Sequence, residues 1–481
     1  MENSYSRVTR TALAGSGIKI DPWASIAWLL PAAAVLFSTM PVGDLAYLVR
    51  AGQLMQLSPS LLRHDVFTFS MGGQPWLNQQ WGAELILAAL FRPLQWRGLC
   101  LVRAALVSFA VGTTYMRTRR ETRAPLVAGC LTFGAFLVAI TLPGTLALRP
   151  QLLAVPLFVS STWFIHQRAS HPDRLLALPV IGITWANVHG SFLLLPLLLA
   201  IAAVDDLVAR RRTLVRTASL AVVTLATPLV SPWGTGTYRY VAQLATSPIV
   251  RDVVDEWKPV VTQFPAWLLF ALAVTAGALV ILRRGSRRPS VEQSVTLVVF
   301  TLLAIWSGRN LIWWLLTVPP VMGALLAGWA PGGRFSLRAS MVISFSLVLL
   351  VLIGVIRVAS LQPQEALLSE APIGVTDALR SSASPGARVF DGRWGSWFEF
   401  SVPSTQMFVD SRAEFFPIAV WRDYFHVSNA EPGWQQVLDR WDVEVVVAAQ
   451  DHDAALIQAI RSDPAWRLTY EDSDGAVFVR G

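Results

Sequence analysis

The chain has 481 residues, of which 54% are hydrophobic, and its mean hydropathy is +0.49. This composition excludes an ordinary water-soluble domain, because repeated long apolar runs are typical of membrane-spanning helices. The net charge of +8 comes mostly from arginines between those runs, so it indicates membrane orientation rather than nucleic-acid binding.

The apolar segments predict an α-helical polytopic membrane protein with about eleven transmembrane helices. The polar N-terminal segment is too long for a standard cleaved signal peptide, and the first apolar run has no convincing small-residue cleavage site, so we expect that span to be retained. The predicted spans are residues 23–40, 98–115, 124–141, 150–167, 174–188, 191–208, 214–230, 263–282, 290–306, 310–328 and 338–358.

Arginine-rich loops predict the orientation in the plasma membrane. If the span count is right, five such loops lie on one side together with Arg7, Arg10 and Lys19. The positive-inside rule places that side, and the N-terminus, in the cytoplasm. We therefore expect a membrane domain over 1–360 and an extracytoplasmic domain over 361–481. The loop arginines are Arg117, Arg119, Arg120, Arg123, Arg168, Arg174, Arg210, Arg211, Arg212, Arg216, Arg283, Arg284, Arg287, Arg288, Arg334 and Arg338.

The first predicted outside loop, residues 41–97, begins with an acid. Asp44 follows the first span and precedes a segment, 45–57, whose apolar spacing predicts a helix lying in the membrane interface. Two roles are open for Asp44: capping that helix, or acting on a substrate where lipid head groups meet water.

Other polar residues gather on the same predicted side. Ionisable groups near the membrane are costly and usually functional, although structural ion pairs also collect charges. The opposite side has arginines but few acids. Carboxylates and arginines beside lipid suit an anionic phosphate head group and a second substrate that must lose a proton. The candidate residues are Asp44, His64, Asp65, Glu84, Arg149, Asn187, His189, Glu256 and Arg309.

The last ~120 residues predict a small α/β domain, because short apolar runs alternate with helix-like stretches. We expect strands at 387–390, 397–400, 406–409, 443–449 and 476–479, and helices at 372–382, 432–441 and 453–462. Asp391-Gly392 after the first strand is interpreted as a turn. The segment 410–414 carries more charge than a turn needs, so a turn and a binding loop both remain open.

No cofactor is predicted with certainty. Cys100 and Cys130 lie in predicted spans, so no disulfide framework is available, and the six histidines lack tight metal-ligand spacing. A divalent metal held by carboxylates stays open. The chain has no phosphate-binding glycine loop of the usual kinds, so a cytoplasmic nucleotide site is not expected.

Short motifs along most of the chain resemble the polytopic, lipid-dependent glycosyltransferases of the GT-C class, in particular their uncharacterised bacterial members. One departure is Ala46-Tyr47, where the class usually has an aromatic pair after its first acid. The order of the motifs carries the resemblance. They lie at 43–48 with Gly52, 64–70, 73–76, 149–151, 185–190, 231–234, 256–257 and 410–412.

The resemblance implies transfer of a sugar from a polyprenyl-phosphate donor to a glycan, lipid or protein acceptor outside the membrane. Asp44 matches the acid that serves as general base or positions the acceptor, and Arg149 or Arg309 is expected to hold the donor phosphate. The alternative is a non-catalytic lipid or glycan transport or cell-envelope assembly protein of the same fold, which predicts acids on both membrane faces. The remaining candidates, expected to orient the acceptor or a metal or to bind substrate, are His64, Asp65, Glu84, Asn187, His189 and Glu256.

Overall fold

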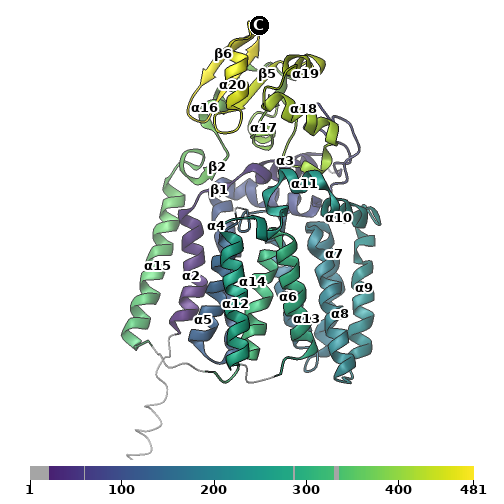
Figure 1. Cartoon of the computed structure of the whole chain (residues 1–481), viewed down its shortest axis with the longest axis vertical. Coiled ribbons are helices and arrows are strands. Elements are labelled where there is room, and N and C mark those ends of the chain that lie inside the picture. Colours follow the sequence, from purple (N-terminus) through teal and green to yellow (C-terminus); the bar gives the residue numbers. More distant parts are fainter. Residues whose placement is uncertain (1–20, 59, 143, 285–287, 330–334) are drawn as a thin grey trace, which may run out of the picture.

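The computed structural model describes residues 21–58, 60–142, 144–284, 288–329 and 335–481. Long helices run side by side in a bundle, and a smaller region with a sheet covers one end of it (Figure 1). The C-terminus lies at the far tip of the sheet region. Five of the basic residues used to predict the orientation lie outside the described residues: Arg7, Arg10, Lys19, Arg287 and Arg334.

Every predicted span overlaps a helix. Among the described residues, four helical segments are long and apolar enough to cross a membrane: Trp81–Thr122, Gly190–Val208, Ala266–Arg283 and Leu337–Ser360. The number of crossings therefore stays a prediction, while the mostly helical character is confirmed. The overlapping helices are α2 (Pro22–Phe37), α4 (Trp81–Thr122), α5 (Pro125–Ile140), α6 (Pro150–His166), α7 (Leu178–Val188), α8 (Leu194–Val208), α9 (Leu214–Ala226), α12 (Ala266–Arg284), α13 (Val291–Trp306), α14 (Leu311–Leu325) and α15 (Leu337–Ser360).

Helix α4 is bent where the predicted outside loop 41–97 ends. It contains Pro93, and Gln95 departs from helical geometry with φ 52° and ψ −165°. Proline removes a backbone donor and clashes with the preceding turn, which accounts for a break at this point. The predicted loop therefore includes a helical segment of α4 before the bend, and the predicted span at 98–115 follows it.

Helix α3 (Gly43–Leu57) confirms the helix expected at 45–57. It lies across the end of the bundle and packs between α4 and α17 (Gly395–Ser401) of the sheet region. Gly52 permits the contact with α4, because a Cβ at this position would overlap the backbone oxygen of Glu84. The bundle and the sheet region thus share α3 as a common layer.

The region beyond the bundle contains a five-stranded sheet of order β4-β3-β5-β7-β6. The β3 pairings with β4 and β5 are parallel, and the β7 pairings with β5 and β6 are antiparallel. Four of the strands match predicted ones. The elements are α16 (Ile373–Ser382), β3 (Arg388–Asp391), β4 (Gln406–Met407), α18 (Ile418–Ser428), α19 (Trp434–Arg440), β5 (Val445–Ala449), α20 (Ala454–Arg461), β6 (Trp466–Glu471) and β7 (Gly475–Arg480).

The strand predicted at 397–400 is wrong, because these residues belong to α17. A four-residue apolar run does not distinguish a strand from a buried helix. Trp397 and Phe400, three residues apart, both face Trp96 of the bundle, with ring centroids 6.0 and 5.0 Å away. That spacing places both rings on one side of a helix.

Side chains alternate between two cores along the central strands. Val389, Val445, Val447 and Val477 belong to the core that continues into the bundle, while Phe390 belongs to a second core on the other face. Successive strand residues point to opposite faces of a sheet, so each strand supplies both cores. One face of the sheet is therefore fixed against the membrane helices.

Two further strand contacts connect the sheet region with the first outside loop. Met40 and Pro41 of β1 (Met40–Pro41) pair in parallel with β2 (Leu368–Ser369). Residues 67–69 continue the sheet beyond β4: Met407 N–H donates to Phe67 O at 3.2 Å, and Phe69 N–H donates to Met407 O at 3.0 Å. The exposed edge of β4 is covered in this way.

The prediction for the end of the bundle away from the sheet needs a correction. The sequence predicts arginines with few acids at this end, but several acids lie there in ion pairs. Arg168 contacts Asp205, Asp206 and Glu292. The scarcity of acids on this face therefore no longer argues against a transport or assembly protein.

The close approach of α3 and α4 predicts a stability effect. We expect Gly52→Ala to lower the free energy of unfolding by about 1–3 kcal/mol, because the added methyl must displace backbone. Gly134→Ala in α5 is the matched control, since a Cβ there meets open space. Unfolding of the purified protein in detergent measures both, and equal stability of the two variants contradicts the packing argument.

Candidate functional site

Asp44 lies in the first turn of α3, but its side chain does not cap the helix. Val42 occupies the N-cap position without a side-chain hydrogen bond. The N–H of Gly43 instead donates to Glu370 Oε2 at 3.0 Å. Asp44 Oδ2 lies 2.8 Å from Arg149 Nε. Of the two roles left open for Asp44, capping is therefore not the one that the structure shows.

Four candidate residues form a chain of alternating charge. Arg149 contacts Asp44 with Nε and Glu256 Oε1 with Nη1, the latter at 2.7 Å. Arg309 Nη1 contacts the same Glu256 oxygen at 3.2 Å. Glu256 thus joins both arginines that sequence analysis proposed for a phosphate. Both arginines therefore take part in structural ion pairs, the general alternative for charges near the membrane.

Helix ends position these side chains. Arg149 is the N-cap residue of α6 and has extended backbone, as expected before Pro150. Arg309 lies in η6 (Gly308–Asn310), a short turn between α13 and α14. Its carbonyl accepts from Gln151 Nε2 at 2.7 Å, and its guanidinium lies 5.1 Å from the Trp257 ring centroid. The two arginines are thereby fixed relative to each other through α6.

His189 places a further hydrogen-bond donor next to Arg309. Its Nδ1 accepts from the Ser191 N–H at 3.1 Å, so the neutral ring carries its hydrogen on Nε2. Nε2 lies 3.5 Å from Arg309 Nη2. Burial, and then the charge of Arg309, hold the pKa of His189 well below its usual range. With this tautomer, His189 Nε2 and Arg309 Nη2 are both hydrogen-bond donors.

A cavity of about 180 Å³ opens beside these groups. The bundle contributes Asp44, Arg149, Glu256 and Arg309, and the sheet region covers the cavity from the other side. The covering residues include Asp410, Arg412 and Glu414, from the charged segment whose role sequence analysis left open. The segment is thus both a turn, since Asp410 Oδ1 accepts from the Arg412 N–H, and a wall of the cavity.

Sequence reasoning missed Tyr240, which also lines the cavity. Its hydroxyl donates to Glu414 Oε1 at 2.7 Å. Burial raises the pKa of Glu414, and burial together with Glu414 raises the pKa of Tyr240 well above its usual value. Tyr240 lies in α10 (Gly236–Thr246), where no local motif marks it. Its proximity to the site follows only from the tertiary fold.

Arg412 is buried in a cluster that joins the sheet region to the first outside loop. Its guanidinium binds both oxygens of Asp410, and Nη2 donates to Asp65 Oδ1 at 2.6 Å. Trp76 and Phe67 cover it, with ring centroids 4.5 and 5.1 Å away. Asp65 is therefore placed in an interdomain ion pair and does not line the cavity of Asp44.

Glu399 completes this cluster as a buried acid whose closest polar neighbour is the carboxyl of Asp410. Burial, and then the nearby charge of Asp410, raise the pKa of Glu399 well above its usual value. A neutral carboxyl is the expected form, because an unpaired buried charge is strongly disfavoured.

Three other candidates lie apart from the cavity. His64 is exposed. Glu84 is buried, and its Oε2 accepts from Asn78 Nδ2 at 2.6 Å. Asn187 Oδ1 accepts from Trp81 Nε1 at 2.8 Å. The last two contacts hold the start of α4 against its neighbours, so the structure gives these residues positions beside the site rather than in it.

A second cavity, of about 360 Å³, adjoins the first beneath the sheet region. The two share Val253, Asp410, Ser411 and Trp421 as lining residues. Asp391 lines the second cavity, and its Oδ1 has no partner although the residue is buried. Burial, and then Asp453, raise the pKa of Asp391 well above its usual value, so the carboxyl can donate a hydrogen bond.

Among the described residues, no group of three or more His, Cys, Asp or Glu side chains has the geometry to hold a metal ion. Asp44 and Glu256, the carboxylates of the first cavity nearest the bundle, are both engaged by arginine. The residues present do not fit a bound divalent cation, and we derive no chemistry through one.

Structural comparison gives similarity over nearly the whole chain. The archaeal oligosaccharyltransferase AglB from Archaeoglobus fulgidus, in complex with an inhibitory peptide and a dolichol-phosphate, has a TM-score of 0.52 at 13% identity, covering 95% of this chain and 74% of its own. The apo form of the Archaeoglobus fulgidus oligosaccharyltransferase has a TM-score of 0.51 at 13% identity. The match covers 100% of this chain and 75% of the oligosaccharyltransferase chain.

ArnT from Cupriavidus metallidurans, bound to undecaprenyl phosphate, has a TM-score of 0.52 at 14% identity and covers 99% of this chain and 98% of its own. At such identities the similarity shows the fold, which is that of GT-C class membrane glycosyltransferases, as predicted. No family model and no curated protein sequence matches the chain.

The raised pKa of Glu399 predicts a pH dependence of stability. The folded carboxyl retains its proton more strongly than the unfolded one, so the free energy of unfolding falls as pH rises above about 4.3, the ordinary pKa. Glu399→Gln removes this proton linkage. We expect the free energy of unfolding of the variant to exceed that of the wild type by up to about 1.4 kcal/mol for each pH unit above the ordinary pKa. Below that pH the two free energies should be equal.

Thermal unfolding between pH 4 and 8 measures the effect of Glu399→Gln. Glu365→Gln is the control, because Glu365 is exposed on the same side of the molecule. If Glu399→Gln and wild type keep a constant difference across this range, the carboxyl is not neutral in the folded protein.

Proposed function

We propose that the protein is a membrane glycosyltransferase that transfers a sugar from a polyprenyl-phosphate donor to an acceptor outside the membrane. One observation carries the proposal: Asp44 and Arg309 line the same cavity at one end of a bundle with the GT-C fold. The pair supplies a base for the acceptor and a cation for the donor phosphate.

Arg309 is better suited to the donor phosphate than Arg149. Arg149 is neutralised by two carboxylates, those of Asp44 and Glu256, whereas Arg309 forms an ion pair with one described acid, Glu256, and shares it with Arg149. The buried His189 lies next to Arg309 but does not line the cavity. A planar guanidinium can bind two phosphate oxygens, so Arg309 by itself offers a two-pronged contact to a phosphate in the cavity.

The hydrocarbon part of the donor has a suitable place. An apolar cavity of about 730 Å³ is lined by residues of α5, α12, α13 and α14. Helices α13 and α14 also flank η6, which carries Arg309. The related AglB and ArnT structures contain dolichol-phosphate and undecaprenyl phosphate, so polyprenyl phosphates are the corresponding class of ligand.

In the proposed reaction Asp44 accepts the proton of an acceptor hydroxyl. Arg149 holds Asp44 Oδ2, and Oδ1 accepts no hydrogen bond from a described residue, so Oδ1 is the oxygen assigned to the acceptor. The acceptor oxygen forms a bond to the anomeric carbon of the sugar as the bond from that carbon to the phosphate oxygen breaks. The negative charge gained by the departing polyprenyl phosphate is stabilised by Arg309.

The second cavity is the proposed approach for the acceptor. It adjoins the first cavity and opens toward the sheet region rather than toward the membrane helices. The protonated Asp391 offers a donor there, and Ser396 and Ser411 add hydroxyl groups to the lining. A hydroxyl-rich acceptor matches this mixture of donors and acceptors.

The alternative function is lipid or glycan transport, or envelope assembly, without catalysis. It is favoured by the charged cavity at the opposite end of the bundle, which places acids at both ends. A transport protein is expected to bind the donor without consuming it. Transfer activity therefore separates the two functions.

Replacing Asp44 tests the proposed base. We expect Asp44→Asn to reduce transfer by about 10²–10⁴-fold, because an amide cannot accept the proton. Donor binding and thermal stability should remain close to wild type. The control is Asp255→Asn, since Asp255 is 82% exposed and lies next to Glu256 in η4 (Asp255–Trp257). Full transfer activity in Asp44→Asn removes Asp44 from the chemistry.

Lysine substitutions test the donor site. We expect Arg309→Lys to weaken donor binding by roughly tenfold, because lysine loses the two-pronged geometry, and Arg149→Lys to weaken it less. Arg251→Lys, on the nearby α11 (Pro248–Val253), is the control. Donor binding and thermal stability are measured on the same samples. Lower stability of Arg309→Lys with unchanged donor affinity means that Arg309 is only structural.

A further inference from the structure

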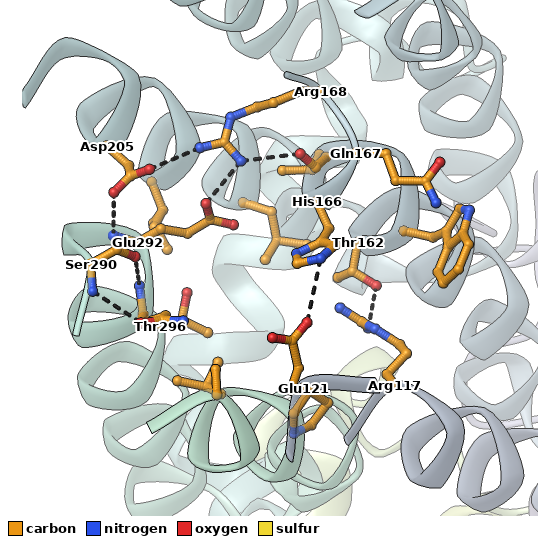
Figure 2. Close-up of a pocket in the computed structure, with 18 of the residues that line it drawn as sticks. Arg117, Glu121, Thr162, His166, Gln167, Arg168, Asp205, Ser290, Glu292 and Thr296 are labelled. Atoms are coloured by element: carbon orange, nitrogen blue, oxygen red, sulfur yellow. Dashed lines mark hydrogen bonds and ion pairs between the residues drawn. The ribbon is translucent and has the colours of Figure 1, made fainter. Parts of the chain in front are cut away.

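A cavity of about 650 Å³, lined in part by charged side chains, lies at the end of the bundle away from the sheet region. Helices α4, α6, α8, α13 and α14 line it, and none of the residues proposed for glycosyl transfer belongs to it. Its volume is in the range of small-molecule sites, about 300–1,000 Å³. Figure 2 shows two groups of charged side chains on its opposite walls.

One wall is a cluster of ion pairs. Arg168 is only 3% exposed and contacts Asp205, Asp206 and Glu292 at 3.0, 2.8 and 2.8 Å, and Arg211 contacts both aspartates. These contacts join the turn after α6 to α8 and α13 (Figure 2). Because every charge in this group has a partner, we assign it to structure and not to a ligand.

The other wall carries Arg117 and Arg120, and the charges of Glu121 and Glu292 act on Arg117 without a direct contact. Arg117 donates to Thr162 Oγ1 at 2.8 Å, and Arg120 lies 4.6 Å from the Trp163 ring centroid. Neither forms an ion pair with an acid in the part of the chain that the structure describes. The acid closest in sequence, Glu121, lies 3.4 Å from His166 instead. The negative end of the α4 helix dipole stabilises the charge of Arg120, which lies in the last turn. Arg117 lies nearly a turn farther from that end.

The cavity becomes apolar between the helices. Leu198, Ile201, Pro320 and Val321 of α8 and α14 line it together with the charged groups. An ion alone would leave this part of the cavity unfilled. A ligand with an anionic head and a hydrocarbon chain matches both parts, because guanidinium groups bind phosphate and the apolar lining accepts the chain.

We propose that this cavity binds the phosphate of an anionic lipid, with Arg117 and Arg120 on the phosphate and the hydrocarbon between α8 and α14. The site is separate from the proposed donor site, since Arg149 and Arg309 lie at the other end of the bundle. Free inorganic phosphate offers the same head-group chemistry without the chain, so the experiment includes both sources.

The test uses the full chain purified in neutral detergent. Binding of short-chain phosphatidic acid, of the matching uncharged diacylglycerol and of inorganic phosphate is measured by native mass spectrometry and calorimetry. We expect phosphatidic acid to bind, and Arg117→Gln or Arg120→Gln to weaken it about tenfold, the loss typical of one charged hydrogen bond. Arg120 is exposed, so its variant is expected to fold even if Arg117→Gln does not.

Two controls make the result specific. Arg216→Gln removes the same charge at the same end of the bundle, where Arg216 pairs with the exposed Asp173 outside the cavity. Arg251→Gln removes an arginine of α11, near the opposite end of the bundle. Neither is expected to change the arginine-dependent binding. If inorganic phosphate binds in a way that depends on Arg117 or Arg120, and phosphatidic acid does not bind, the lipid assignment is overturned. Equal binding of phosphatidic acid to Arg120→Gln and wild type, or equal binding of the diacylglycerol, overturns the site.

Discussion

The carboxylate of Glu256 holds together the part of the molecule on which the proposed chemistry depends. It contacts Arg149 at 2.7 Å and Arg309 at 3.2 Å, and these arginines come from different helix ends. Without it the two guanidinium groups would face each other as like charges, and Asp44 would be held by an arginine with no second anchor. The four alternating charges position one another, so the cavity has a defined shape before any ligand arrives.

The same charges limit what the cavity can bind. Asp44, Arg149, Glu256 and Arg309 sum to zero, so a phosphate adds a negative charge to a neutral set. Arg412 cannot offset it easily, because Asp410 and Asp65 already engage its guanidinium. The guanidinium left for a phosphate in this cavity is therefore that of Arg309, which shares Glu256 with Arg149. This charge balance favours a phosphate diester with a single negative charge, such as a sugar attached to polyprenyl phosphate, over a more highly charged group.

The sequence predicted the helical part of the fold well, since each predicted span overlaps a helix. The site was predicted in part. Asp44, Arg149, Glu256 and Arg309 line one cavity, whereas His64, Asp65, Glu84, Asn187 and His189 do not. A charge beside a predicted span marks the right end of the bundle. It does not reveal its partner, because partners such as Asp65 and Arg412 lie far apart in the sequence.

The errors in the sheet region have similar causes. The run at 397–400 is too short to define a period, and packing against Trp96 makes it helical. Strand β6 was missed because its residues are mostly exposed and its apolar pattern is weak. Tyr240 and Glu414 form a pair across the two parts of the molecule, and no local pattern links them.

The strand contact between the first outside loop and β4 has a consequence for the order of assembly. Ser70 donates to the carbonyl of Phe408, which follows it by 338 residues. During synthesis the loop emerges long before its partner exists, so residues 67–69 have no strand to pair with until most of the chain has been inserted. Closure of the sheet is thus among the last steps of maturation. A translocation error in any intervening helix would leave this edge open, exposing an unfinished sheet to quality-control proteases.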